Sequence, residues 1–393
     1  MYKRQSYNRI NNTVWSDERL NPPFFANAFA TVQDGLPILY TLGPDYPDNP
    51  ALGRGLDERG GIRGSRIELR VIDPHATLPY SYNWFAGVQR QLPWKFVLEA
   101  NYIGTKGRNF MSNDGPGGED YNRFAGDMLD GVRNRFNPSF GAIGLAESRL
   151  SSQYHGFTLQ LNRRFSSGLS LQTAYTLGNA KDYPGSAEEV TDLARDYGNA
   201  AFDVRHKLAM NVIWRIPYEP QQAILRNTIG GWQLNTVTIW QSGLPFTVTC
   251  NAAYPVCDFN ADGNASDRPN LPSYGTDVSG ISEEQWLAGG IAIADFPLPT
   301  GGALGTLPRN AMYGPGYFSS DFSLFKNVTV PLFGSRAQTF QFRIEAYNVF
   351  NTLNLTNPNS NTAATNFGRV TAVRAPAGLP GARLVQLGVK FMF

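Results

Sequence analysis

The sequence predicts an all-β protein, an antiparallel transmembrane β-barrel, from three observations. Residues 383–393 alternate in polarity, and one strand face carries the apolar residues Val385, Leu387, Val389, Phe391 and Phe393. Several earlier segments alternate in the same way, and the connections between them are short and long in turn. Strands of a membrane barrel alternate because one face meets lipid and the other the lumen, and short periplasmic turns alternate with longer extracellular loops.

Composition narrows the alternatives. The chain has 393 residues with 34 basic and 32 acidic side chains, a formal net charge of +2, so no nucleic-acid partner is expected. Charged residues make up 17% and aromatic residues 13%, and the high aromatic share fits girdles at two membrane interfaces. The sequence holds no apolar run near the roughly 18 residues that a membrane-spanning helix needs.

The N-terminal region, residues 1–78, is expected to be rich in loops. Residues 34–64 are rich in Gly, Pro and Asp, whereas residues 66–72 fit a short strand or part of an extracellular hairpin. Residues 1–5 resemble the translated end of a sequencing-library adapter, and the chain shows no signal peptide. We therefore expect a fragment whose true N-terminus lies upstream, with residues 79–393 as the C-terminal portion of one barrel domain.

Four pairs of alternating segments precede the closing strand. They lie at residues 82–89 and 96–102, 157–161 and 169–176, 208–216 and 232–240, and 318–324 and 340–345. We expect about 9–11 strands in this chain, part of a larger, incomplete barrel whose remaining strands lie upstream, since bacterial barrels have even strand numbers. We expect the polar faces of these strands to point into the lumen. Their side chains either contact a plug or substrate or simply line a water-filled barrel. The residues are Glu99, Gln160, Gln172, Asn211, Arg215, Gln341, Arg343 and Glu345.

The long connections define the outer side of the barrel. They cover residues 106–150, 181–200, 251–309 and 352–367. Because extracellular loops are the long ones, we expect the short turns and the C-terminus on the periplasmic side.

The ordered series of segments resembles a known family. Residues 79–93, 96–109, 202–217, 231–249, 314–327 and 340–355, followed by the closing strand, resemble the barrel of TonB-dependent outer-membrane receptors of the Oar-like type. The resemblance implies a transporter for a scarce nutrient in the Gram-negative outer membrane, with membrane lipid and an unknown small ligand as partners. Family members also carry an N-terminal plug domain and a TonB-engaging segment, so TonB would be reached only through an N-terminal region missing here. The closing strand resembles the signal that the barrel-assembly machinery reads, with Val385, Leu387, Val389, Phe391 and Phe393 as its residues.

A metal site is predicted in the longest loop. Asp258, Asn260, Asp262, Asn264 and Asp267 place oxygen ligands at calcium-loop spacing, and Gly263 supplies the sharp bend. Pro269 stands at the twelfth position, where a bidentate Glu is usual. The alternative is a solvated turn, because Asn, Asp and Gly favour turns without any metal.

Two cysteines, Cys250 and Cys257, precede that loop. A close pair suits a local disulfide in an oxidising compartment, and two free thiols are the alternative. A third polar group, Asp203, Arg205 and His206, is read as a lumen-facing ion pair beside a histidine rather than a catalytic cluster. With three histidines lacking zinc spacing and no nucleophile motif, we expect no enzyme and no cofactor beyond a structural calcium.

Two other functions stay open. A passive porin-like or adhesin-like barrel shares the architecture without energy coupling, and its genes would lack a plug and a TonB-engaging segment. A secreted, soluble β-rich binding or hydrolytic protein is the more distant reading. It would bury both faces of its strands and have no belt facing lipid.

Overall fold

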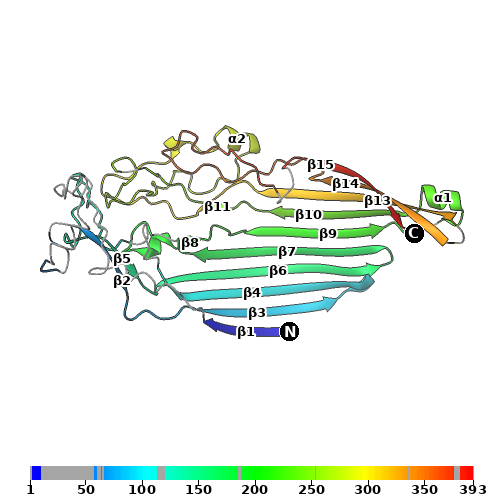
Figure 1. Ribbon diagram of the computed structural model, residues 1–393, viewed down its shortest axis with the longest axis horizontal. Helices are drawn as coiled ribbons and strands as arrows, with labels where there is room; N and C mark the ends of the chain where they lie inside the picture. Colours follow the sequence, from blue (N-terminus) through cyan, green and yellow to red (C-terminus); the bar gives the residue numbers. More distant parts are fainter. Residues whose placement is uncertain are drawn as a thin grey trace, which may run out of the picture.

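A computed structural model describes residues 2–9, 57–59, 63, 66–112, 120–184, 187–218, 220–252, 254–333, 336–375 and 381–392. Its main element is one sheet of eleven strands laid side by side (Figure 1). The strands that form its hydrogen-bonded path, here called the wall, are β1 (Tyr2–Arg9), β3 (Tyr80–Gln91), β4 (Phe96–Phe110), β6 (Leu150–Ser166), β7 (Leu169–Asp182), β9 (His206–Arg215), β10 (Trp232–Gln241), β13 (Tyr317–Phe333), β14 (Arg336–Tyr347) and β15 (Leu384–Met392). The eleventh strand, β8 (Gly198–Asn199), pairs with the end of β7.

Every neighbouring pair in the wall is antiparallel, as predicted. The four predicted pairs and the closing strand are all found. β1 is an addition, because no strand was expected at residues 2–9. β1 and β15 stand at the two ends of the strand order and are not paired with each other in the described residues, so the sheet is open there. An open antiparallel sheet of this size agrees with an incomplete barrel.

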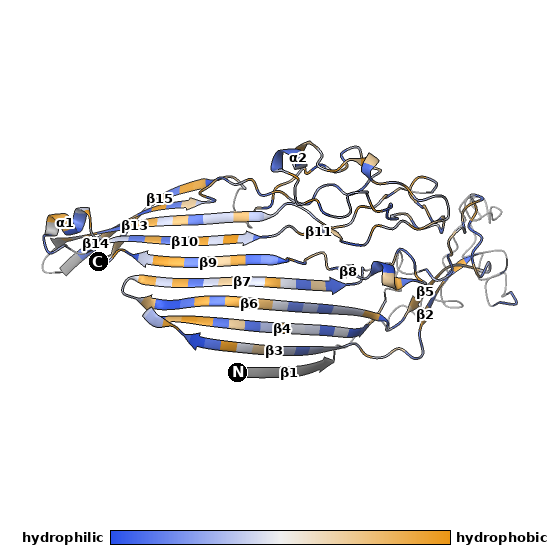
Figure 2. Ribbon diagram, turned by 180° about the vertical axis from the view of Figure 1, so that it is seen from behind, coloured by the Kyte–Doolittle hydropathy of each residue, from blue (hydrophilic) through white to orange (hydrophobic). Residues whose placement is uncertain are grey.

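The register separates the two faces of the wall. In adjacent strands Phe340 stands opposite Phe391, and Phe342 opposite Val389, while Gln341 between them stands opposite Lys390. The same alternation of apolar and polar residues is visible along the strands in Figure 2. The apolar face is open rather than covered, since Leu387 is 74% exposed and Val389 65%. That exposure contradicts the soluble reading, in which both faces would be buried.

The short connections lie together at one end of the wall (Figure 1). One two-residue connection joins β6 to β7 through Ser167 and Gly168, which have φ of 50° and 82°, the sign that a two-residue hairpin turn requires. A Cβ on Gly168 would lie 2.3 Å from the carbonyl oxygen of Arg215, so glycine is needed there on two counts. The longest of these links, between β9 and β10, contains the short helix α1 (Ala223–Thr228).

The long connections lie at the other end and form what we call the loop layer: the described parts of residues 66–79, 111–149, 183–205, 242–316 and 348–383. It contains the paired strands β2 (Ile67–Ile72) and β5 (Phe140–Ala146), the paired strands β11 (Pro245–Phe246) and β12 (Met312–Tyr313), and helix α2 (Glu283–Ala288). Of the two expectations for residues 66–72 the short strand is right, although it pairs in parallel with β5 and so forms no hairpin with it. The loop expectation for residues 34–64 lies almost wholly outside the described residues.

Helix α2 shows how the loop layer is fixed. Ser282 caps it, because its hydroxyl accepts from the N–H of Gln285 while the Gln285 side chain accepts from the N–H of Ser282. The helix presents Trp286 to the largest buried apolar cluster, which contains Phe246, Val248, Val278, Trp286, Ile291, Phe296, Leu307, Met312, Leu355 and Val370. Among the described residues, no helix is both long and apolar enough to span a membrane.

Candidate functional site

The inner face of the wall carries the predicted lumen residues. Through the register all eight, Glu99 to Glu345, fall on the same face of the sheet, opposite the exposed apolar face. Midway along β6, β7, β9 and β10 this face is hollowed by a cavity of about 490 Å³. Four carboxamides contribute to its lining: Gln160, Asn162, Gln172 and Asn211. The surface is therefore suited to hydrogen bonding with neutral groups.

Side chains on this face also bond to one another. Gln89 donates to the carboxylate of Glu99 at 3.0 Å, and Gln341 donates to the side-chain Oδ1 of Asn327 at 2.9 Å. Arg343 in turn donates to Gln341 at 2.7 Å. The first two bonds join neighbouring strands and the third lies within β14, and together they hold the polar groups in fixed positions.

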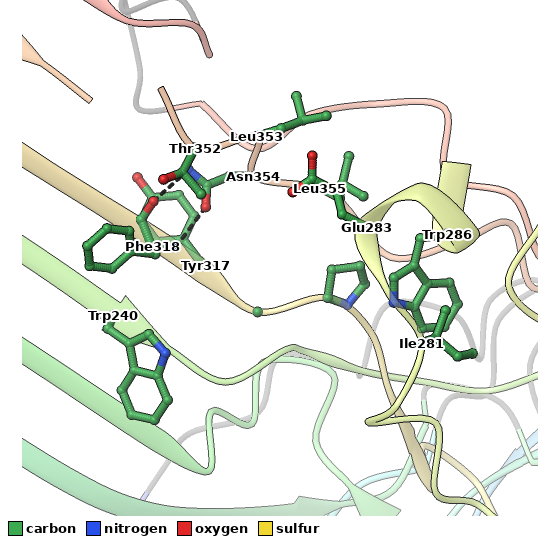
Figure 3. Close-up of a pocket in the computed structure, with 12 residues that line it drawn as sticks. Trp240, Ile281, Glu283, Trp286, Tyr317, Phe318, Thr352, Leu353, Asn354 and Leu355 are labelled. Atoms are coloured by element: carbon green, nitrogen blue, oxygen red, sulfur yellow. Dashed lines mark hydrogen bonds between the residues drawn. The ribbon is translucent and has the colours of Figure 1, made fainter. Parts of the chain in front are cut away.

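A second hollow, of about 290 Å³, lies where the wall meets the loop layer (Figure 3). Trp240 at the end of β10 and Phe318 at the start of β13 line its wall side, and Trp286 and Glu283 of α2 its loop side. Asn354 fixes the junction, because its side chain both accepts from the N–H of Phe318 at 2.7 Å and donates to its carbonyl at 2.9 Å. The hollow combines aromatic faces with one carboxylate.

Buried charges join distant loops of the loop layer. Arg268, whose side chain is 6% exposed, contacts the carboxylates of Glu188 and, at 2.6 Å, of Asp196. Arg123 contacts Asp262 at 3.1 Å and donates to the carbonyl oxygen of Ala187 at 2.9 Å. Because a buried charge is costly without a partner, these pairs specify how the loops dock.

The predicted calcium loop is buried inside this network. Asp258, Asn260, Asp262 and Asp267 are each at most 3% exposed, so the turn is buried rather than solvated, and metal binding stays a prediction. The Asp258 carboxylate accepts from the N–H groups of Asp262 and Gly263 at 2.9 and 2.8 Å, and Gly263 has φ of 86°. Asn264, the fifth predicted ligand, stands at the loop margin and donates its N–H to Asp262 at 2.8 Å.

Burial raises the pKa of two of these carboxyls strongly. The pKa of Asp262 is raised to about 6 by desolvation, against the opposing charge of Arg123. The pKa of Asp267 is raised to about 7 by desolvation, and the charges of Glu188, Asp262 and Asp258 add to that rise. Across the described residues, His, Cys, Asp and Glu side chains do not already surround a metal position in groups of three or more.

The two remaining predicted groups lie in the loop layer. Cys250 and Cys257 are joined by a disulfide, and both are buried. Asp203 and Arg205 precede β9 instead of sharing a strand face, and no ion pair joins them in the described residues. The expected lumen-facing ion pair is therefore wrong. The loop turns Asp203 inward, where it accepts from the hydroxyl of Tyr313 at 2.9 Å.

A family comparison identifies the architecture. The family model described as "Outer membrane beta barrel domain" matches residues 5–386. The chain belongs to this outer-membrane β-barrel family. Its place is the Gram-negative outer membrane, and the exposed apolar face of the wall is the face that meets lipid. No curated protein matches the sequence.

Several solved structures are similar to this outer-membrane chain at low identity. The outer membrane transporter YddB from Escherichia coli is 11% identical with a TM-score of 0.41, and the match covers 83% of this chain and 34% of the YddB chain. The ferric-catecholate import receptor Fiu from K12 E. coli is 11% identical with a TM-score of 0.39, covering 80% and 28%. The siderophore receptor PiuA from Acinetobacter baumannii is 9% identical with a TM-score of 0.40, covering 80% and 28%. The chain thus spans about a third or less of the length of these structures.

In this outer-membrane setting the closing strand takes a definite position. β15 is the last strand of the order, and Val385, Leu387, Val389 and Phe391 lie on its lipid-facing side. Phe393 lies outside the described residues. Recognition of these residues by the assembly machinery stays a prediction.

Sequence reasoning missed the buried network of the loop layer. Arg123 and Asp262 are 139 residues apart, and Arg268 and Asp196 are 72 apart. No periodic pattern links such positions. One sequence feature could have indicated a folded loop layer. The polar loops contain Phe246, Trp286 and Phe296, and large apolar side chains in loops need a core that covers them.

Proposed function

We propose that this barrel belongs to an energy-coupled outer-membrane receptor of the TonB-dependent, Oar-like type, which takes up a scarce nutrient. The observation that carries the proposal is the ordered polar inner face of the wall beside a folded loop layer. Loops that fold around their own buried core present a fixed surface to the outside. Such a surface suits the capture of a solute better than unstructured loops do. The ordered sequence resemblance from residue 79 to the C-terminus supports the same function.

In this proposal the parts have separate tasks. The loop layer selects the solute, and the inner face contacts a plug domain encoded upstream or the passing solute. The hydrogen-bonding groups around Asn211 and Gln172 suit a ligand or plug segment rich in amide or hydroxyl groups. Coupling to TonB would act through that plug, and the closing strand would be read by the barrel-assembly machinery.

Liposome permeability of the product of the complete gene separates the receptor from a passive barrel. Purified protein in liposomes is exposed to arabinose and glucose, and binding to the isolated C-terminal domain of TonB is measured alongside. A receptor with its plug in place gives no swelling above empty liposomes and binds TonB. Rapid swelling without TonB binding would overturn the proposal and select the porin-like function.

Two neighbouring substitutions then test the inner face itself. Asn211→Trp fills the cavity between β7 and β10, whereas Val212→Trp points to lipid on the same strand. We expect the first to lower TonB-dependent growth on a limiting nutrient at least tenfold and the second to leave it near wild type. Equal effects of the two would contradict a functional role for the inner face.

A further inference from the structure

We propose that residues 258–267 form a Ca²⁺ site that locks the loop layer, a role separate from nutrient uptake. The side chains of Asp258, Asn260, Asp262 and Asp267 and the main-chain oxygen of Asn264 are its ligands. Ca²⁺ takes six to eight oxygen ligands of this kind, and it accepts irregular geometry.

The loop already has the backbone shape of such a site. Asp258 bonds to the N–H groups of Asp262 and Gly263, which draws the first and fifth positions together. Asp267 closes the loop from its far end, because its Oδ2 accepts from the N–H groups of Phe259 and Asn260 at 2.6 and 3.2 Å. Asp267 thus replaces the distant Glu whose usual position is occupied by Pro269.

An unsatisfied atom points to the missing partner. Asp267 is only 1% exposed, and its Oδ1 has no hydrogen-bond partner among the described residues. The same carboxylate is tied to the loop at residues 259 and 260, so its free oxygen lies within the loop. A buried carboxylate oxygen without a donor or cation is strongly unfavourable.

The charges around it are of the wrong sign to satisfy it. Asp258 and Asp262 are buried in the same loop as Asp267, and Glu188 is joined to that loop through Arg268. Arg123 pairs with Asp262, and Arg268 pairs with Glu188. None of the described ion pairs joins an arginine to Asp267, so this buried carboxylate lacks a cation of its own.

A divalent cation removes both defects at once. It neutralises the converging carboxylates and satisfies the free oxygen of Asp267. Since three acidic side chains do not yet enclose one position, binding draws the carboxylates inward and brings in oxygens from Asn260 and the main chain. Oxygen-only ligands favour Ca²⁺ over zinc, and a site assembled from flexible loop groups favours it over Mg²⁺, which demands near-ideal octahedral geometry.

The position of the site defines its effect. Loop 254–270 contacts residues 123–134 and 187–196, as seen in the Gly126 N–H bond to the Asn260 carbonyl oxygen and in the Arg268 pairs. Phe259, inside the metal loop, packs in one cluster with the Cys250–Cys257 disulfide. An ion held here therefore joins three loops of the layer while leaving the wall unchanged.

Calorimetric titration of the EDTA-treated full chain in detergent with CaCl₂ tests the proposal. We expect one site with a Kd of about 10⁻⁴–10⁻³ M, the range of extracellular calcium modules. Asp267→Asn and Asp262→Asn should each weaken binding at least tenfold. Asp277→Asn is the matched control, because Asp277 is exposed in the same long loop and hydrogen-bonds to its near neighbour Ser279. No heat up to about 5 mM, or equal affinity for MgCl₂, would overturn the site.

Hydrogen exchange of the wild-type chain keeps the test independent of whether the variants fold. Ca²⁺ should slow exchange at least tenfold in residues 254–270 and in the contacting segment 120–134, with no change in β9 and β10. In Asp267→Asn the ion should have no effect, although the neutral side chain relieves carboxylate repulsion and keeps the metal-free loop folded. Ca²⁺-independent exchange in the wild type, or the same Ca²⁺ response in Asp267→Asn, would contradict the proposal.

Discussion

Trp286 in the loop layer is 3% exposed, whereas Leu387 in the wall is 74% exposed. The two residues represent their regions, because the large buried apolar clusters lie in the loops and the apolar face of the wall is open. A soluble protein would show the reverse arrangement, with sheets packed over a core and loops in water. Here lipid takes the place of the core for the wall, and the loops must build a core of their own.

The comparison explains how each region is stabilised. In the wall, the main-chain ladders satisfy the polar backbone, and lipid accepts the apolar face. In the loop layer, side chains supply the stability through apolar packing and buried ion pairs such as that of Arg268 with Asp196. The same type of substitution should therefore have different consequences in the two regions.

The largest expected difference comes from truncating one apolar side chain in each region. Trp286→Ala removes a buried indole that packs edge-on against Phe246, with ring centres 6.4 Å apart, and should destabilise the loop layer by about 3–5 kcal/mol. Leu387→Ala removes a side chain that contacts lipid or detergent and leaves no cavity behind, so it should cost only the lost apolar contact, about 1–2 kcal/mol. Hydrogen exchange of the loops and heat-modifiable gel migration of the barrel measure the two regions separately.

The control for this pair is whether the effects stay in their own regions. Trp286→Ala should leave gel migration of the folded barrel unchanged, and Leu387→Ala should leave loop protection unchanged. Loss of the folded barrel in Trp286→Ala would show that the loop core supports the wall as well.

A smaller effect should distinguish the two faces of the wall. Val212 pairs with Thr236, midway between Trp232 and Trp240 of the adjacent strand, and points to lipid. Val212→Arg should cost about 2–4 kcal/mol, the penalty for a cation near the bilayer midplane. Asn211→Arg, one residue away on the inner face, should cost far less because the lumen is polar. Denaturant titrations in lipid vesicles give both values, and equal costs would mean that the two faces have been assigned wrongly.

The same contrast shows what the sequence could reveal. The wall was predictable because its sequence pattern is local. Residues two apart share one face of a strand, so a segment such as 208–216 predicts both a strand and which of its faces is apolar. Strand β1 was not predicted, because Tyr2–Arg9 contains polar and charged residues without apolar alternation. The calcium-loop prediction for residues 258–267 rests on local spacing, since the oxygen-bearing residues are near neighbours in sequence, and it stays a proposal.

The burial of that loop was not predictable. It depends on Arg123, Glu188 and Arg268, which come from three separate loops, and no short pattern records such long-range contacts. The position of Asp203 failed for a related reason. It was expected to face the lumen, but β9 begins at His206, and Asp203 lies in the preceding loop, where it accepts a hydrogen bond from Tyr313 of β12.

The smallest expected effect concerns the hydrogen bonds of the inner face. Gln341 accepts from Arg343 and donates to Asn327. Gln341→Ala removes both bonds, yet should lower stability by only about 1 kcal/mol or less, because water in the lumen replaces them. Gln386→Ala, on the same face of β15, is the control, since the described residues show no hydrogen bond from its side chain. Denaturation midpoints in vesicles compare the two variants. A loss of several kcal/mol in Gln341→Ala would show that water does not reach this part of the inner face, which would then be a buried surface and not a water-lined one.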